Sequence, residues 1–238
     1  MRFTLAAVIG LALAVPAQAD SLSEADVKRL ALEAILENPG IVMEAVQILQ
    51  DQEAEALQAS AIEALRAERE ALLAGAPVVG NPSGDGVIIE FFDYNCPYCR
   101  RAKPALQALL DEDDDLQIVF REWPILGEGS VFAARAALAA REQDLYEEFH
   151  FALMGINGRA EKPSVMRVAE EVGLDIDRLL ADMEAPEIDA HIEESTRLAA
   201  LLGFNGTPSF VIGETLIPGL VEKDDLARAV EDARASAD

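Results

Sequence analysis

A short buried strand that runs directly into a pair of cysteines constrains the fold of this chain more than any other feature. Residues 87–93 are mostly apolar, β-branched or aromatic and are bounded by turn residues, which predicts a buried strand. Cys96 and Cys99, the only cysteines among 238 residues, follow in a C-x-x-C sequence. Residues 96–111 have a helical pattern, so we expect both thiols at the start of a helix.

The rest of the C-terminal part alternates between strand and helix patterns, which predicts an α/β domain over residues 76–238. A helical insertion is expected at about 129–203, between the second and third strands. The predicted order is strand, helix, strand, helical insertion, two strands and a helix. The first strand and helix are those described above. The second strand is expected at 116–123, the insertion at 130–202, the last two strands at 207–212 and 215–217, and the final helix at 222–235.

Residues 20–75 are predicted to form a helical arm. Ser21 or Ser23 can cap its start, and Asn38-Pro39-Gly40 interrupts the helical pattern. Its apolar stripe is thin, so the arm needs a partner surface. That partner is either the following domain or another copy of the chain. We favour a homo-oligomer, a dimer or a trimer, formed through residues 20–75.

The N-terminus has the three parts of a secretory signal. Arg2 supplies the positive charge, residues 5–15 are apolar, and Ala17-Gln18-Ala19 predicts cleavage before Asp20. The alternative is a membrane anchor, but the apolar run is shorter than the ~20 residues of a spanning helix. Residues 1–19 are therefore predicted to be a signal peptide, and the mature protein is expected in the periplasm, where a disulfide can persist.

The charge balance limits the possible partners. The chain has 19 Lys and Arg against 44 Asp and Glu, a formal net charge of −25. Nucleic-acid binding needs clustered cations to neutralise phosphates, so we expect no nucleic-acid partner.

The position of the cysteines favours redox chemistry. At a helix N-terminus the backbone N–H groups and the helix dipole stabilise a thiolate, so Cys96 is expected to attack and Cys99 to resolve the mixed disulfide. A zinc site would need two more ligands, and His150 and His191 are far apart in the sequence. A purely structural disulfide and a Cu(I)-binding dithiol remain as alternatives.

Three segments carry a resemblance to a known family. Residues 90–99 (EFFDYNCPYC), 121–127 (REWPILG) and 206–210 (GTPSF) resemble the DsbA-like thioredoxin-fold oxidoreductases, over about residues 78–235. The arm around Glu37-Asn38-Pro39 resembles the N-terminal oligomerisation region of the suppressor-of-copper-sensitivity C (ScsC) branch. The resemblance implies a thioredoxin fold with an inserted helical domain, preceded by an α-helical arm.

The resemblance also implies roles for individual residues. Cys96 would be an exposed nucleophile and Cys99 a buried resolving thiol. Pro208 would be a cis proline facing them. Glu90 would be a buried carboxylate that assists proton transfer at Cys99, although a water-exposed carboxylate at the strand edge is the alternative.

The remaining implied roles concern substrate binding and the redox potential of the cysteine pair. Thr207 would offer backbone hydrogen bonds to an extended substrate, and Pro97 and Tyr98 would tune the redox potential. Tyr98 could equally contact substrate. No organic cofactor is implied, because the redox-active group is the Cys96–Cys99 disulfide itself.

We therefore predict an exported disulfide isomerase or reductase that acts on unfolded or wrongly bridged exported proteins with a membrane redox partner. The Pro97-Tyr98 dipeptide equals that of DsbG-type proteins, and the threonine before Pro208 is also isomerase-like. The alternatives are a dithiol oxidase, a Cu(I)-binding copper-tolerance protein and a non-catalytic holdase. We also expect removal of residues 20–74 to leave a folded monomer that loses isomerase activity but keeps simple disulfide reduction.

Overall fold

The computed structural model describes residues 22–237. The predicted signal peptide, residues 1–19, lies outside the described residues. The chain divides into two compact units, one ending at Ala54 and the other beginning at Glu55. No helix within the described range is long and apolar enough to cross a membrane.

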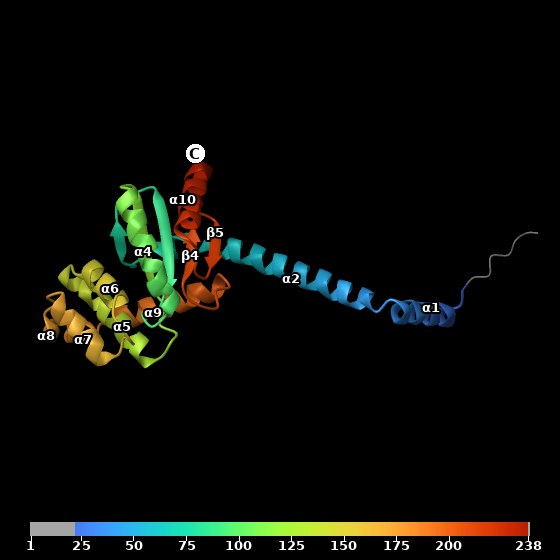
Figure 1. Ribbon diagram of the computed structural model, residues 1–238, viewed down its shortest axis with the longest axis horizontal. Coiled ribbons are helices and arrows are strands. Elements are labelled where there is room, and N and C mark those ends of the chain that lie inside the picture. Colours follow the sequence, from blue (N-terminus) through green and yellow to red (C-terminus); the bar gives the residue numbers. More distant parts are fainter. Residues whose placement is uncertain (1–21, 238) are drawn as a thin grey trace, which may run out of the picture. The chain divides into compact units, whose positions relative to one another are not determined.

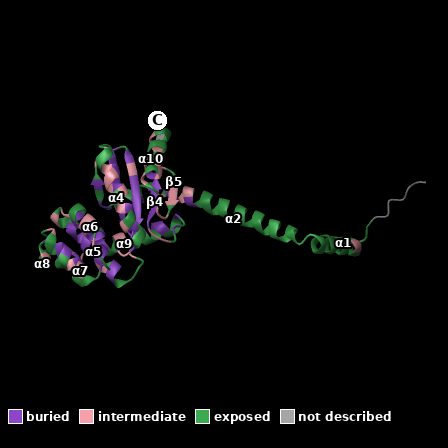
Figure 2. Cartoon of the chain, in the orientation of Figure 1, coloured by how far each residue is buried: buried purple, intermediate pink, exposed green. Residues whose placement is uncertain are grey.

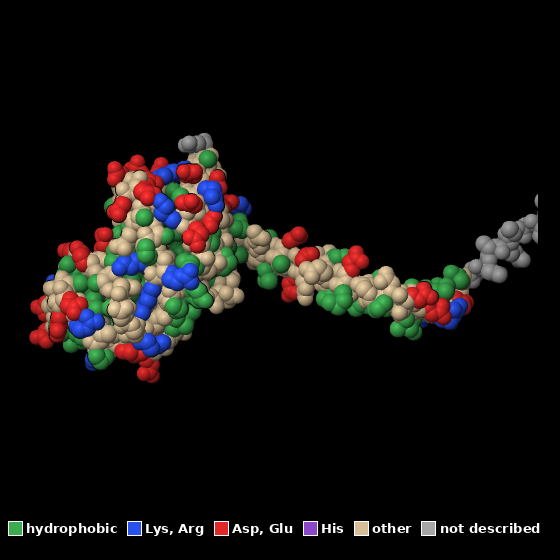
Figure 3. Space-filling model, viewed as in Figure 1, with side chains coloured by type: hydrophobic (Ala, Val, Ile, Leu, Met, Phe, Trp, Pro, Cys, Tyr) green, Lys and Arg blue, Asp and Glu red, His purple; other side chains and the backbone are tan. Residues whose placement is uncertain are grey.

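The N-terminal unit contains helix α1 (Glu24–Glu37) and the first part of helix α2 (Gly40–Ala67). Ser23 caps α1 by accepting a hydrogen bond from the Asp26 N–H, and the predicted break falls at Asn38-Pro39. No residue of α1 is buried. Figure 2 shows that this unit is mostly exposed, and Figure 3 shows apolar side chains along it. The exposed large apolar side chains of this unit are Leu22, Val27, Leu30, Leu32, Ile35, Leu36, Ile41, Val42, Met43, Val46, Ile48 and Leu49.

The second unit is built on a five-stranded sheet in the order β1-β3-β2-β4-β5. The central strands β2 and β3 are parallel, and the other pairs are antiparallel. Helices α4 and α10 pack against the sheet (Figure 1). The bounds are β1 Val78–Gly80, β2 Gly86–Phe92, α4 Pro97–Glu112, β3 Leu116–Glu122, β4 Ser209–Ile212, β5 Thr215–Pro218 and α10 Lys223–Ala237.

The predicted helical insertion lies between β3 and β4, and most of it forms a helical bundle beside the sheet (Figure 1). Its elements are α5 Glu128–Ala140, the 3-10 turn η1 Arg141–Gln143, α6 Tyr146–Met154, α7 Lys162–Glu171, α8 Ile176–Asp182 and α9 Pro186–Leu201. The thioredoxin fold with an inserted helical domain and a preceding helical arm is therefore confirmed.

Two features differ from the expectation. Residues 78–80 form strand β1, which the predicted order of elements does not include. The second unit also begins at Glu55 rather than at residue 76, because the end of α2 and helix α3 (Arg69–Leu73) bury Ala61, Leu65 and Leu72. A domain cut at residue 74 would lose these apolar contacts.

Side chains alternate along β2 and β3, so the sheet has two different faces. We call the face that carries Glu90 and Glu122 the first face; it packs on α4, α5, α6 and α10. We call the face that carries Phe91 and Arg121 the second face; its apolar core includes side chains of α2, α3 and α9. The cysteines belong to the core of the first face.

Candidate active site

Cys96 is the N-cap residue of α4, and Pro97 occupies the first position of that helix. The chain turns here because the Cys96 N–H donates to the Asp93 carbonyl at 3.0 Å, directly after β2. Proline suits a helix start, where no intrahelical acceptor is available for its missing N–H. The predicted strand–turn–helix unit is therefore present, with both cysteines at its helix start as free thiols.

The Cys96 thiol is poised to ionise. Its pKa is lowered to about 6, mainly by the hydrogen bond from the Cys99 thiol, then by the Thr207 side chain and the backbone N–H groups of Cys99 and Tyr98, against the opposing effect of burial. A thiol of this kind is largely thiolate at neutral pH, and the thiolate is the reactive form.

Cys99 has the opposite character. Burial raises its pKa far above the ordinary range, and the hydrogen bond to Cys96 and the charge of Glu90 act in the same direction. It therefore stays protonated while Cys96 is ionised. The two thiols are chemically unequal, as an attacking thiol and a resolving thiol must be.

The segment before β4 covers the cysteines from the other side. The Thr207–Pro208 peptide bond is cis, and the Cys96 thiol donates to the Thr207 carbonyl at 3.0 Å. This contact joins residues 111 positions apart. It also explains one difference from the expectation: Cys96 is only 3% exposed in this reduced state, rather than an exposed nucleophile. Pro97 and Tyr98 do lie at the surface, with Tyr98 53% exposed.

Glu90 lies in the middle of β2 and is 1% exposed, which excludes the alternative of a water-exposed strand-edge carboxylate. Its register partners are Phe120 and Phe210. Burial, followed by the charge of Cys96, raises its pKa to about 8. The Oε1 atom has no hydrogen-bond partner among residues 22–237, so Glu90 can hold or accept a proton close to neutral pH.

A polar clamp that the sequence did not reveal ties the cysteine turn to the helical insertion. The Asn95 side chain donates to Ser130 Oγ at 3.0 Å and to the Ala160 carbonyl at 3.1 Å, and it accepts from the Ala160 N–H at 2.8 Å. Arg100 donates to the carbonyls of Tyr94 and Gly158. Ser130 and Ala160 lie 35 and 65 residues from Asn95 in the sequence, so no local sequence pattern predicts these contacts.

A second unpredicted network lies deeper on the first face. Glu122 accepts hydrogen bonds from Tyr146 at 3.0 Å and Tyr94 at 3.3 Å, and Tyr94 also bonds His150 Nδ1 at 3.0 Å. Burial raises the pKa of Glu122 and lowers that of His150 to about 3, so the histidine is neutral. His150 is therefore part of a buried network, while His191 lies in α9, away from it.

The comparisons with known proteins agree with this geometry. The DSBA-like thioredoxin domain family matches residues 87–231. A thioredoxin-like oxidoreductase from Silicibacter pomeroyi DSS-3 is 60% identical, with 68% of this chain and 94% of that chain covered and a TM-score of 0.67. Proteus mirabilis ScsC in a transitional conformation is 28% identical, with 91% and 98% covered and a TM-score of 0.68.

Curated relatives include much longer proteins. The Na(+)/H(+) antiporter NhaA 3 of Salinispora tropica is 31% identical over 152 residues, which cover 63% of this chain and 23% of the antiporter. The chain thus spans about a quarter of the length of the curated relatives it matches.

Proposed function

The chain belongs to the DSBA-like thioredoxin family, and from this premise we propose that it is an exported thiol–disulfide oxidoreductase that isomerises and reduces disulfides in client proteins. The observation that carries the proposal is the inequality of the two thiols: Cys96 lies at the helix start beside Thr207 with its pKa lowered, and Cys99 is buried behind it with its pKa raised.

In the first step the Cys96 thiolate attacks one sulfur of a client disulfide. A bond forms between Cys96 Sγ and that sulfur, the client S–S bond breaks, and the second client sulfur leaves as a thiolate. The low pKa of Cys96 supplies the nucleophile. It also makes Cys96 a good leaving group in the reverse direction.

The mixed disulfide then has two outcomes. In isomerisation another client thiolate attacks the client sulfur and releases the Cys96 thiolate, with no net oxidation. In reduction Cys99 loses its proton and attacks Cys96 Sγ, the bond between Cys96 and the client sulfur breaks, and that sulfur leaves as a thiolate; the pair becomes a disulfide and the client gains two electrons. A membrane dithiol partner must then return two electrons to the pair.

Glu90 is the proposed proton acceptor for the reductive outcome. Its charge raises the pKa of Cys99, and its own pKa of about 8 lies close to working pH. Thr207 and the cis Pro208 would bind the client backbone beside Cys96, while Pro97 and Tyr98 would set the potential and contact the client.

The helical arm has the features of a surface through which copies of the chain associate. Its apolar side chains have no buried contacts within α1, and we propose that residues 20–75 bring two or three copies together, so that several active sites face one client. Cleavage before Asp20 would release the chain into the periplasm.

One observation favours a dithiol oxidase as the second candidate. A low Cys96 pKa stabilises the reduced form, and stabilising the reduced form makes the disulfide more oxidising. The Pro97-Tyr98 dipeptide and the expected assembly favour the isomerase instead.

Reactivation of scrambled ribonuclease tests the proposal. The mature protein, with both thiols reduced, is expected to restore ribonuclease activity. Cys96→Ser should abolish the effect, whereas Cys99→Ser should keep part of it, because isomerisation needs only the attacking thiol. No reactivation by the wild type, together with rapid oxidation of reduced ribonuclease by its disulfide form, would replace the isomerase with the oxidase.

A further inference from the structure

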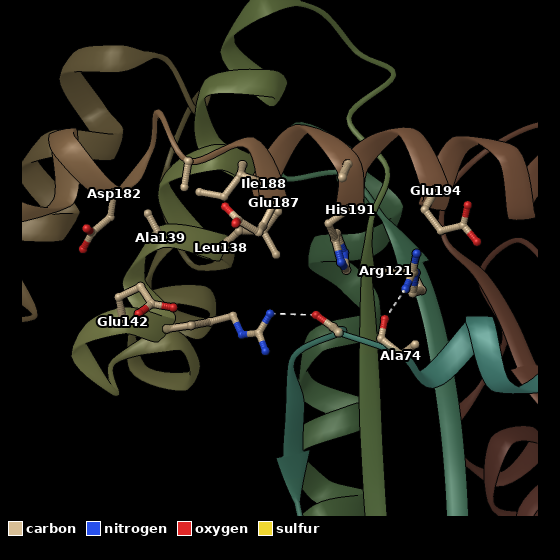
Figure 4. Close-up of a pocket in the computed structure, with 14 residues that line it drawn as sticks. Ala74, Arg121, Leu138, Ala139, Glu142, Asp182, Glu187, Ile188, His191 and Glu194 are labelled. Carbon is tan, nitrogen blue, oxygen red and sulfur yellow. Dashed lines mark hydrogen bonds between the residues drawn. The ribbon is translucent and has the colours of Figure 1, made fainter.

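A large cavity opens on the second face, and no cysteine and no residue proposed above to act in disulfide exchange lines it. It measures about 880 Å³, within the range of small-molecule sites. Its wall comes from the segment after α3, from β3, from α5 and η1, and from α8 and α9 (Figure 4).

A buried arginine forms one end of the cavity. Arg121 is fully buried, and its Nη1 reaches only the carbonyls of Ala74 at 3.3 Å and Ala71 at 3.5 Å. Its Nε and Nη2 have no hydrogen-bond partner, and no carboxylate among residues 22–237 forms an ion pair with it. Burial lowers its pKa to about 10, so the group is still cationic at neutral pH. A buried cation without a counter-charge is costly.

Two further nitrogen groups lie at the same end. Arg141 donates to the Gly75 carbonyl at 2.7 Å and has no ion pair within the described part of the chain. His191 Nε2 is buried and unpartnered among those residues. Figure 4 shows the His191 ring beside Arg121, on the α9 side of the cavity. The nearby Glu194 is already held by Arg197 at 2.6 and 2.8 Å.

The opposite end of the cavity is acidic. Figure 4 places Asp182 and Glu142 away from Arg121. Asp182 Oδ2 is buried without a hydrogen-bond partner, although Arg178 Nε lies 3.4 Å from it. Glu142 and Glu187 are exposed at the rim, and neither forms an ion pair with another described residue. The cavity therefore offers donors without hydrogen-bond partners at one end and, at the other, the Asp182 carboxylate, whose Oδ2 has an ion pair with Arg178 but no hydrogen bond.

We propose that this cavity binds a small zwitterion, with its carboxylate at Arg121, His191 and Arg141 and its ammonium group at Asp182 and the Glu142 and Glu187 rim. A carboxylate would satisfy the two free guanidinium nitrogens together, as planar bidentate pairing allows. An ammonium group would give Asp182 Oδ2 the hydrogen bond that its ion pair with Arg178 does not supply. The site is independent of disulfide exchange, because it shares no residue with the cysteine turn or the Thr207–Pro208 segment.

The probe is 6-aminohexanoate, whose charges are separated by a flexible chain, with hexanoate as the matched compound that lacks the amine. Because the chain has only two histidines, the ring resonances of His191 report on binding, and those of His150 serve as an internal control. We expect saturable shifts of the His191 resonances, with hexanoate binding more weakly.

Arg121→Met should weaken 6-aminohexanoate binding at least about tenfold, since charged hydrogen bonds are lost. Exposed Arg167→Met, outside the cavity, should leave binding unchanged. Replacing an unpaired buried cation by an apolar side chain of similar length is not expected to prevent folding; if it does, Arg141→Met and Asp182→Asn give the same test.

Three results would overturn the proposal: no saturable His191 shift at millimolar probe, equal affinity in the cavity variants and the wild type, or equal affinity for hexanoate and 6-aminohexanoate. Ribonuclease reactivation by Arg121→Met should equal that of the wild type, which keeps this site separate from the proposed function.

Discussion

Two neighbouring charged residues of β3 lie on opposite faces of the sheet and have different surroundings. Glu122 lies on the first face, where its Oε1 accepts hydrogen bonds from Tyr94 and Tyr146, while its Oε2 has no hydrogen-bond partner among the described residues. Arg121, one residue earlier, lies on the second face, where two of its nitrogens are unpaired beside a cavity. The difference is therefore one of space: Glu122 is packed against two tyrosines, whereas the free nitrogens of Arg121 adjoin a cavity that leaves room for a ligand.

The faces also differ in what covers them. The first face is covered by elements that follow the cysteines, namely α4, α5, α6 and α10. The second face depends partly on residues that precede the sheet, since Leu65 and Leu72 complete its apolar core. The second face is thus the one that a truncation at the N-terminus would damage.

The largest expected effect comes from removing that cover. Deleting residues 20–54 should leave the second unit folded, whereas deleting residues 20–74 also removes two buried leucines and should cost several kcal/mol of unfolding free energy, at roughly 2–5 kcal/mol for each buried leucine lost. Urea denaturation followed by circular dichroism measures both. Equal midpoints for the two truncations would show that the second face does not need residues 55–74.

A smaller effect is expected at Glu90, on the first face. Its carboxyl has a folded pKa of about 8, above its ordinary value of 4.5. Between these values the folded protein holds the proton and the unfolded chain releases it, so stability falls as pH rises from about 5 to 8. Glu90→Gln should flatten this slope, with a difference on the order of a few kcal/mol at pH 8.

Urea denaturation of the reduced protein at several pH values measures the Glu90 effect, with exposed Glu231→Gln as the control. The same variant should slow single-turnover reduction of a disulfide peptide, because Cys99 loses its proton acceptor. An unchanged slope would mean that Glu90 is ionised in the folded protein.

The smallest effect on stability is expected in the hydrogen-bond network around Glu122. Tyr146→Phe removes one of two hydrogen bonds to the buried Glu122 and should cost about 1–3 kcal/mol. Tyr98→Phe, at an exposed tyrosine, is the matched control and should change stability by less than about 0.5 kcal/mol. If both variants lose the same amount, the network contributes nothing specific.

Much of the fold could be predicted because its signals are local. The apolar runs of β2 and β3, the C-x-x-C at a helix start and the Thr207-Pro208 step each occupy a few consecutive residues. Strand β1 was missed because it has only three residues among turn formers. The compact unit begins at Glu55, before the predicted boundary, and the α2 pattern does not change where that helix enters the core.

The unpredicted parts of the site depend on contacts between distant segments. The Asn95 clamp joins residues 95, 130 and 160, and the Glu122 network joins residues 94, 122, 146 and 150. One signal was available: Arg121 and Glu122 end a strand that is otherwise apolar apart from Gln117. Charged residues within a buried strand point to polar networks or cavities on its two faces.

The central claim is that Cys96 is the ionised thiol and Cys99 the protonated one in the same reduced molecule. Alkylation of the reduced wild-type protein by iodoacetamide across pH, with each cysteine located by mass spectrometry, tests this most directly. The account predicts modification of Cys96 alone, with a midpoint near pH 6. Modification with a midpoint near the free-thiol value of ~8.5, or modification that begins at Cys99, would contradict it.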